Sequence, residues 1–203
     1  MLETLKPALL LFILLNPFLL VVYLIDLFEK VPAQLFDRIM FRATVVSSAV
    51  FVVFALVGDV IFRDLLQARF ASFQVFGGIV FLVIGLRFVF QGNEAIPGLR
   101  GEGAHVAGAI AMPVMIGPGT IGASVLAGEN LGPVMAPIVI VVVVLLTTLI
   151  VLALKRLHDW VRPRNEPLVE RYIEATGRIT ALVVGAFAVE MILTGLNGWW
   201  TAR

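Results

Sequence analysis

The chain contains no cysteine among its 203 residues, and only 14% of its residues are charged. The missing thiols exclude disulfide bridges, zinc–thiolate centres and cysteine nucleophiles. The low charge excludes an ordinary soluble domain, in which about a quarter of the residues are charged. Nucleic acid is not an expected partner, because the net charge is only +1 and the basic residues are scattered.

Apolar residues make up 60% of the sequence and gather in long runs. A helix that crosses a lipid bilayer needs about 20 such residues in succession. Six windows meet this requirement: 5–28, 40–62, 70–90, 104–126, 133–154 and 175–197. Short linkers leave no room for a soluble domain. The sequence therefore predicts an all-α membrane protein with six transmembrane helices in one domain, residues 1–203.

Lysine and arginine are distributed unevenly between the two sets of loops. The side that carries the termini holds four of them: Lys6, Arg63, Arg69 and Arg203. The opposite side holds nine: Lys30, Arg38, Arg42, Arg100, Lys155, Arg156, Arg162, Arg164 and Arg171. Cytoplasmic loops carry the excess of positive charge, so we expect both termini to lie outside the cell.

The six windows divide into two halves of three, residues 1–92 and 104–198. An odd number of crossings in each half predicts two inverted repeats that run in opposite directions through the membrane. The first window of each half, the first and fourth of the chain, is interrupted near its middle. The interruptions are Asn16–Pro17 in "LLNPFLL" and Gly117–Pro118 in "PVMIGPGTI". Paired interruptions in corresponding helices are typical of transporters with discontinuous helices.

Each interruption frees backbone polar groups that lipid does not satisfy. Proline has no N–H and clashes with the carbonyl four residues earlier, so Pro17, Pro113 and Pro118 each free a carbonyl. A half-helix that begins after the second break would present the N–H groups of Gly119, Thr120 and Ile121 at the positive end of its dipole. Such backbone is tolerated at membrane depth where protein buries it or where it lines a water-filled cavity.

These groups predict a binding site for a small zwitterionic molecule, made of Asn16, Pro17, Pro113, Gly117, Pro118, Gly119, Thr120 and Ile121. The N–H groups would take its carboxylate, whereas the freed carbonyls and Asn16 would take its ammonium. Rocking of the two halves around the site would then alternate its access. A packing kink is the alternative interpretation, because glycine and proline are common in membrane helices.

Two further charges fall inside predicted membrane helices. Aligning Gly92 with Gly195 at the ends of the third and sixth windows sets Arg87 against Glu190. A charge at the centre of a membrane helix costs about 2.5–3.5 kcal/mol on insertion scales. The two residues would therefore form a structural pair, or Glu190 would bind H+ or Na+ during transport while Arg87 tunes it.

Two other classes of function fit the sequence less well than a transporter does. An intramembrane enzyme needs a nucleophile with its base or a cluster of metal ligands, and the motifs H-E-x-x-H, G-x-S-x-G and the P-loop are all missing. A membrane scaffold would explain the helices but not the paired interruptions. We therefore expect no catalytic residues, no metal and no cofactor, and uphill transport would draw on an ion gradient or on exchange. The sequence leaves a homo-oligomer open.

The same residues resemble the MarC family of bacterial and archaeal inner-membrane proteins. "PVMIGPGTI" is similar to the signature of its fourth span, and "FGGI" at 76–79, "GRI" at 177–179 and "EMILTGL" from Glu190 resemble other recurrent positions. The first-span motif of the family has a further asparagine and proline where this chain has Leu20 and Val22. The resemblance implies six spans, an outer N-terminus, kinship with LysE-type exporters and transport of small neutral amino acids such as glycine and alanine.

Overall fold

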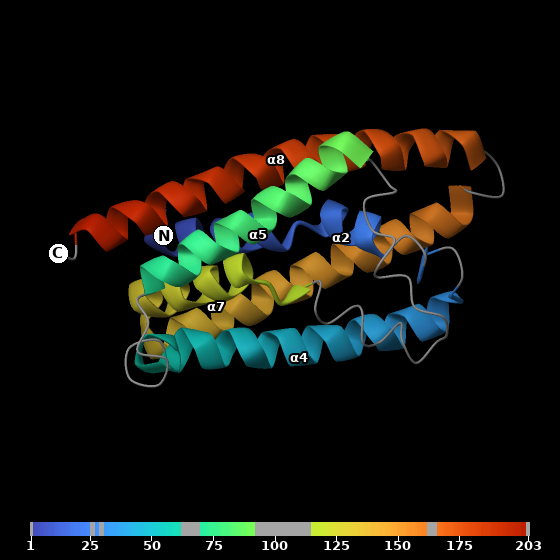
Figure 1. The fold of residues 1–203 in the computed structure, drawn as a ribbon. Helices are drawn as coiled ribbons and strands as arrows, with labels where there is room; N and C mark the ends of the chain where they lie inside the picture. Colours follow the sequence, from blue (N-terminus) through green and yellow to red (C-terminus); the bar gives the residue numbers. More distant parts are fainter. Residues whose placement is uncertain are drawn as a thin grey trace.

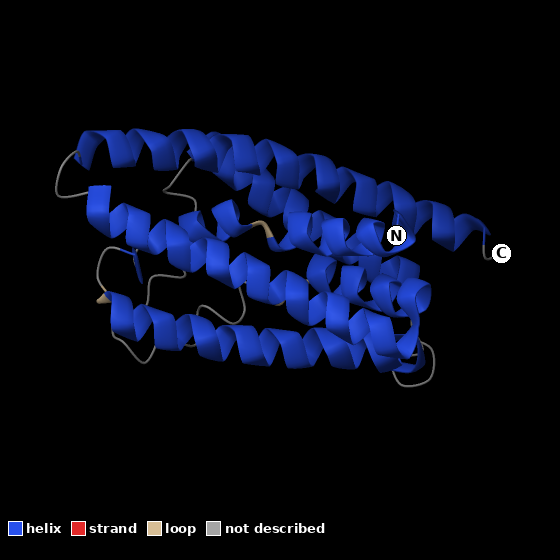
Figure 2. Ribbon diagram, turned by 180° about the vertical axis from the view of Figure 1, so that it is seen from behind, coloured by secondary structure: helices blue, strands red, loops and turns tan. Residues whose placement is uncertain are grey.

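The computed structural model describes residues 2–24, 27–28, 31–61, 70–91, 115–161 and 166–201. The long elements of this part of the chain are all helices. They are α1 (Leu2–Leu15), α2 (Pro17–Tyr23), α4 (Ala33–Val60), α5 (Phe70–Gln91), α7 (Pro118–Val161) and α8 (Glu166–Thr201). Figure 1 shows them as one elongated bundle in which both chain termini lie toward the same end, and Figure 2 shows the bundle from behind.

Helix α7 consists of two helices that meet at Gly132, where φ is 75° and ψ is 178°. A positive φ favours glycine, and Pro133 next in the chain has no N–H to continue the hydrogen-bond ladder. The chain turns back at this point, so the first part of α7 (yellow) and the second part (orange) run in opposite directions in Figure 1. Helix α7 thus contains the last nine residues of the predicted fourth window and the whole fifth window.

Three helices are long and apolar enough to cross a membrane, namely Ala33–Gly58, Pro118–Val161 and Ala181–Trp200. Leu5–Val21 and Ala71–Arg87 are shorter apolar helices. An all-helical membrane protein is therefore confirmed, with α1, α2 and α5 in the predicted first and third windows. The count of six crossings stays a prediction, because residues 92–114, with the start of the fourth window, lie outside the described residues.

Helices α5 and α8 pack along a seam of small residues. Added Cβ atoms on its glycines would lie within about 3.5 Å of the facing helix at three levels: Ala71 with Gly195, Gly78 with Ala188, and Gly85 with Ala181. The contacts recur every seven residues in both helices and in reversed order, so the helices are antiparallel and follow the repeat of a coiled coil. Small residues allow this approach, which gives membrane helices their packing energy.

Helix α4 packs on α7 by two different kinds of contact. Near one end, a Cβ added to Gly128 would overlap the carbonyl group of Ala55, so the two backbones touch there. Farther along, the buried hydroxyls of Thr44 and Thr148 lie 2.6 Å apart and share a hydrogen bond between the helices. Hydroxyl groups can satisfy each other in this way without water.

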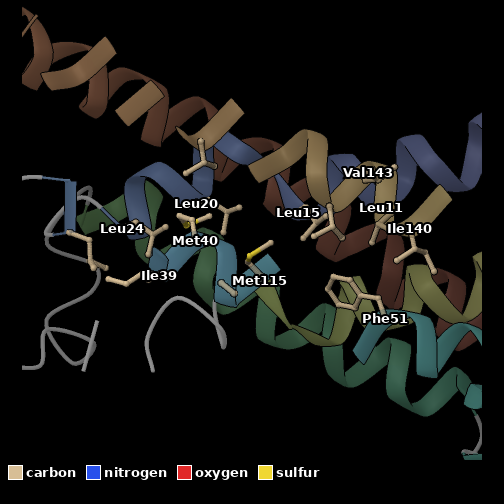
Figure 3. Close-up of a cluster of buried hydrophobic side chains, with 14 of the residues drawn as sticks. Leu11, Leu15, Leu20, Leu24, Ile39, Met40, Phe51, Met115, Ile140 and Val143 are labelled. Atoms are coloured by element: carbon tan, nitrogen blue, oxygen red, sulfur yellow. The ribbon is translucent and has the colours of Figure 1, made fainter. Parts of the chain in front are cut away.

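The buried apolar core lies between the first segment of the chain, α4 and α7. Its labelled members in Figure 3 are Leu11, Leu15, Leu20, Leu24, Ile39, Met40, Phe51, Met115, Ile140 and Val143, each at most 7% exposed. This core joins the two halves of the chain, because the residues up to Phe51 belong to the first half and the others to the second.

Candidate functional site

The first interruption is a sharp turn at Asn16, whose φ is 40°. Its N–H donates to the Phe12 carbonyl at 3.0 Å and so completes α1. Its side-chain Oδ1 accepts the N–H of Leu19 at 3.1 Å, as an N-cap does. Pro17 then occupies the first helical position of α2, where its missing N–H costs nothing. Asparagine tolerates the left-handed conformation better than most residues.

This turn leaves backbone acceptors on the last turn of α1. Pro17 has no N–H to offer the carbonyl of Ile13. The N–H of Leu19 bonds to Asn16 Oδ1 in place of the carbonyl of Leu15. The hydrogen bond from Leu19 uses one lone pair of Asn16 Oδ1. The backbone carbonyls of Ile13 and Leu15 are therefore better acceptors for an ammonium group than the Asn16 side chain. A contact between Asn16 and the ammonium stays a prediction.

The second interruption ends at Pro118, the first residue of α7. The hydroxyl of Thr120 organises it: Oγ1 accepts the N–H of Gly117 at 2.9 Å and lies 3.0 Å from the carbonyls of both Met115 and Gly117. Thr120 is 2% exposed and lies near the start of α7, where the sequence places it. The N–H of Ile121 donates to the Gly117 carbonyl at 3.0 Å, so the expectation that it is free was wrong.

The N–H groups of Gly119 and Thr120 belong to the first turn of α7, where a helix provides no acceptor of its own. Gly119 is buried against the neighbouring pair of helices. A Cβ there would overlap the ring of Phe81 on α5 and would lie 3.3 Å from Met191 Sδ on α8. The open end of the half-helix thus faces a tight space in which an aromatic ring is the nearest neighbour.

The structure brings the two interruptions to the same buried cluster. Leu15 and Leu20, on either side of the first break, and Met115, just before the second, are each at most 3% exposed and belong to one cluster. Figure 3 shows Met115 between these leucines and Phe51 of α4. Pro113, another residue of the predicted site, lies outside the described residues.

Arg87 and Glu190 do not form the predicted pair. Both side chains are exposed, and the ion pairs found in the described part of the chain do not join them. Gly78 packs on Ala188, so Glu190 lies near the level of Gly78. Arg87 is nine residues farther along α5, or about 13 Å at 1.5 Å per residue. Arg87 and Glu190 occupy equivalent positions in the repeat alignment. Because α5 and α8 are antiparallel, these equivalent positions lie at different depths along the bundle. Binding of H+ or Na+ by Glu190 stays a prediction.

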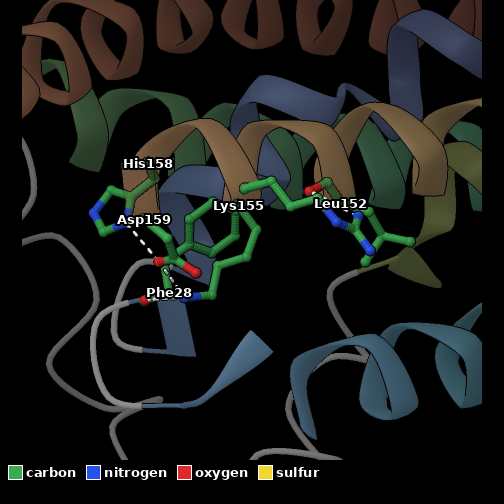
Figure 4. Close-up of polar contacts among 6 residues, drawn as sticks. Phe28, Leu152, Lys155, His158 and Asp159 are labelled. Carbon is green, nitrogen blue, oxygen red and sulfur yellow. Dashed lines mark hydrogen bonds and ion pairs between the residues drawn. The ribbon is translucent and has the colours of Figure 1, made fainter. Parts of the chain in front are cut away.

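A polar cluster that the sequence analysis missed lies near the end of α7 (Figure 4), and Figure 1 shows this end of α7 on the side of the bundle away from the termini. Lys155 Nζ donates to the Phe28 carbonyl at 2.7 Å and to Asp159 Oδ1 at 2.5 Å, and the side chain of Lys155 is 4% exposed. His158 Nδ1 lies 3.3 Å from the same carboxylate oxygen. The sequence did offer one indication of this cluster: Lys155 and Asp159 are four residues apart, a spacing that allows an ion pair on one face of a helix.

A second contact joins the same ends of α7 and α4. Arg156 Nη2 lies 3.1 Å from Asp37 Oδ2, and the two side chains are 60% and 40% exposed. Two polar contacts therefore connect α7 of the second half to residues 28 and 37 of the first half. Within the described residues, no group of three or more side chains is placed to hold a metal ion.

Comparisons with known proteins agree with this architecture. The chain is 28% identical over 197 residues to a UPF0056 membrane protein of Methanocaldococcus jannaschii, with 92% of each chain covered. It is 24% identical to one of Pyrococcus horikoshii, covering 97% of this chain and 94% of the relative, and 20% identical to one of Buchnera aphidicola, covering 98% of both. No solved structure matches. The model of the MarC family integral membrane proteins matches residues 2–200. The chain therefore belongs to the MarC family.

Proposed function

We propose that this protein is a secondary transporter of small zwitterionic solutes, chiefly small neutral amino acids, that works by alternating access. One observation carries the proposal. Two half-helices, α2 and α7, each begin at a proline directly after a backbone turn, and both turns border one buried cluster. Interrupted helices that meet near the centre of a membrane protein supply N–H groups for anions and carbonyls for cations.

The chemistry at the two interruptions suits a small amino acid. The first-turn N–H groups of Gly119 and Thr120 would bind its carboxylate, helped by the positive end of the helix dipole. The carbonyls of Ile13 and Leu15 would bind its ammonium. Because the ring of Phe81 packs on Gly119, the space beside these N–H groups suits a hydrogen or methyl side chain better than a large one.

The seam between α5 and α8 supports two inverted repeats, residues 1–92 and 104–198. The alignment of Gly92 with Gly195 also pairs Gly78 with Ala181 and Gly85 with Ala188. These are contact residues of the seam, so the third and sixth windows use equivalent small residues to pack on each other. Two halves related in this way would rock about a central site and open it to one side at a time.

The orientation follows from the loop charges. Both termini would lie outside the cytoplasmic membrane of a bacterium or archaeon, and the Lys155 cluster would lie on the cytoplasmic side. Reporter domains fused after Arg203 and in the linker after Val161 would test this. We expect the C-terminal reporter to be active in the periplasm and the linker reporter in the cytoplasm. The reverse pattern would contradict it.

The transport experiment uses the full chain in proteoliposomes. Radiolabelled glycine and alanine are supplied with no gradient, with a pH gradient and with a sodium gradient, beside leucine and a small sugar as controls. We expect glycine and alanine to accumulate above empty liposomes, and the gradient that drives accumulation identifies the coupling ion. Absence of uptake and of counterflow for every small amino acid would contradict the proposal and favour a membrane scaffold.

A further inference from the structure

Ser47 lies on the buried face of α4 and is 0% exposed. Its hydroxyl has no hydrogen-bond partner among the described residues. The other buried hydroxyls in this part of the chain are all bonded: those of Thr44, Thr120, Ser124, Thr147 and Thr148. A buried hydroxyl that bonds to nothing lowers stability, so its presence in a membrane helix needs an explanation.

The serine does not use the acceptor that its own helix offers. A serine or threonine in a helix can donate to the carbonyl four residues earlier. Thr44 does so in α4, at 2.8 Å from the Met40 carbonyl. The Ser47 hydroxyl makes no such bond to the Ala43 carbonyl, so both its donor and its acceptor are open to another group.

Helical spacing places Ser47 beside the buried cluster that borders the two interruptions. Ala43 and Phe51 lie one turn on either side of it along one face of α4, and both belong to this cluster. In Figure 3, Met115 lies between Met40 and Phe51 along the bundle. Ser47 follows Met40 by seven residues and precedes Phe51 by four. It therefore lies near the depth of Met115, directly before the second interruption.

We propose that Ser47 binds the carboxylate of the transported amino acid, as a third polar contact beside the first-turn N–H groups of Gly119 and Thr120. A carboxylate can accept about four hydrogen bonds, so two N–H groups leave room for a hydroxyl. A hydrogen bond to a charged group is stronger than one between neutral groups, which offsets the cost of burying this hydroxyl. The inference rests on the proposed transport and extends the site to α4, which contains neither interruption.

Stability and affinity should respond in opposite ways to the loss of this hydroxyl. Ser47→Ala removes a group that bonds to nothing in the protein, and alanine favours a helix more than serine does. Without substrate, the thermal unfolding midpoint of the variant in detergent should therefore equal or exceed that of the parent. For alanine uptake into proteoliposomes, KM should rise about tenfold because a charge-assisted bond is lost. The loss should appear in KM rather than in the maximal rate, since the bond forms when the substrate binds.

Ser48→Ala is the matched control. Ser48 is the next residue of α4, is partly exposed, and points about 100° away from Ser47 around the helix. The same side-chain change at this position should leave the KM for alanine at the parental value.

The inference is overturned if Ser47→Ala takes up alanine with the parental KM, and the proposed transport would still stand in that case. It is also overturned if the substrate-free variant unfolds at a lower temperature than the parent, because the hydroxyl would then have a partner within the protein. If the parent itself transports no small amino acid, the proposed function fails and the inference fails with it.

Discussion

Lys155 of α7 donates a 2.7 Å hydrogen bond to the backbone carbonyl of Phe28, 127 residues earlier in the chain. The side chain that makes this bond is 4% exposed, and its charge is balanced by Asp159 on the next turn. The ring of Phe28 also packs edge-on against His158 and Phe36. The buried ammonium of Lys155 thus joins the end of the first window to the end of α7.

Replacing this lysine tests its structural role. Lys155→Met keeps the length of the side chain but leaves the Phe28 carbonyl without its donor, so we expect a loss of about 1–3 kcal/mol in unfolding free energy. Asp159 is partly exposed, and water reduces its share of the loss. Arg156→Met is the control, because the pair of Arg156 with Asp37 is solvent-exposed and should contribute less than about 1 kcal/mol. Denaturant titration in detergent measures the unfolding free energy of both variants. Equal losses would contradict a structural role for the buried Lys155.

Close backbone contact between α4 and α7 makes a second prediction. Gly128→Ala would push a methyl group into the carbonyl of Ala55 and force the helices apart, at a cost of about 1–3 kcal/mol. Gly185→Ala is the matched change, because a Cβ there meets nothing within 4 Å and alanine favours the helix by about 1 kcal/mol. Thermal unfolding in detergent should show a lower midpoint for the first variant and an unchanged or higher midpoint for the second. The opposite order would argue against the packing.

The polar contacts at the Lys155 end of the bundle predict how access alternates. If rocking of the halves opens this end, a covalent link between α4 and α7 should stop transport. Asp37→Cys combined with Arg156→Cys places two thiols on the ends of α4 and α7 that this ion pair joins. Because cysteine is much shorter than arginine, a bifunctional thiol reagent is needed to bridge them. Bridging should abolish alanine uptake, whereas each single variant treated with the same reagent should keep it. Full uptake by the cross-linked protein would show that this end does not open.

Much of the architecture was predictable because lipid imposes simple rules on sequence. Backbone groups in a membrane must bond within the chain, so long apolar runs predict helices, and Pro17 and Pro118 predicted the breaks. The motif around Gly117 also indicated the MarC family, which the family match confirms.

The wrong predictions concern the depth of residues along the bundle and their contact partners, which the spacing of apolar residues in the sequence does not determine. Arg87 and Glu190 are equivalent in the repeat alignment, yet antiparallel packing separates them along the bundle. The Ile121 N–H makes the first hydrogen bond of α7, to the Gly117 carbonyl, because the helix begins at Pro118 and Ile121 is its fourth residue. Lys155 looked like a loop charge because it ends an apolar window. Its burial depends on Phe28, which is distant in sequence.

The proposed transport requires the second interruption to hold the transported molecule. This depends on Thr120, because its hydroxyl fixes Gly117 and Met115 beside the first-turn N–H groups of α7. Thr120→Val keeps the shape of the side chain and removes the hydroxyl, whereas Thr120→Ser keeps the hydroxyl.

The decisive measurement is the initial rate of alanine uptake into proteoliposomes containing the parent or either variant at equal protein density. We expect near-parental uptake for Thr120→Ser. For Thr120→Val we expect at least a tenfold loss, about 1.4 kcal/mol, with normal helix content. Parental uptake by folded Thr120→Val would contradict the claim and leave the interruption as a packing feature.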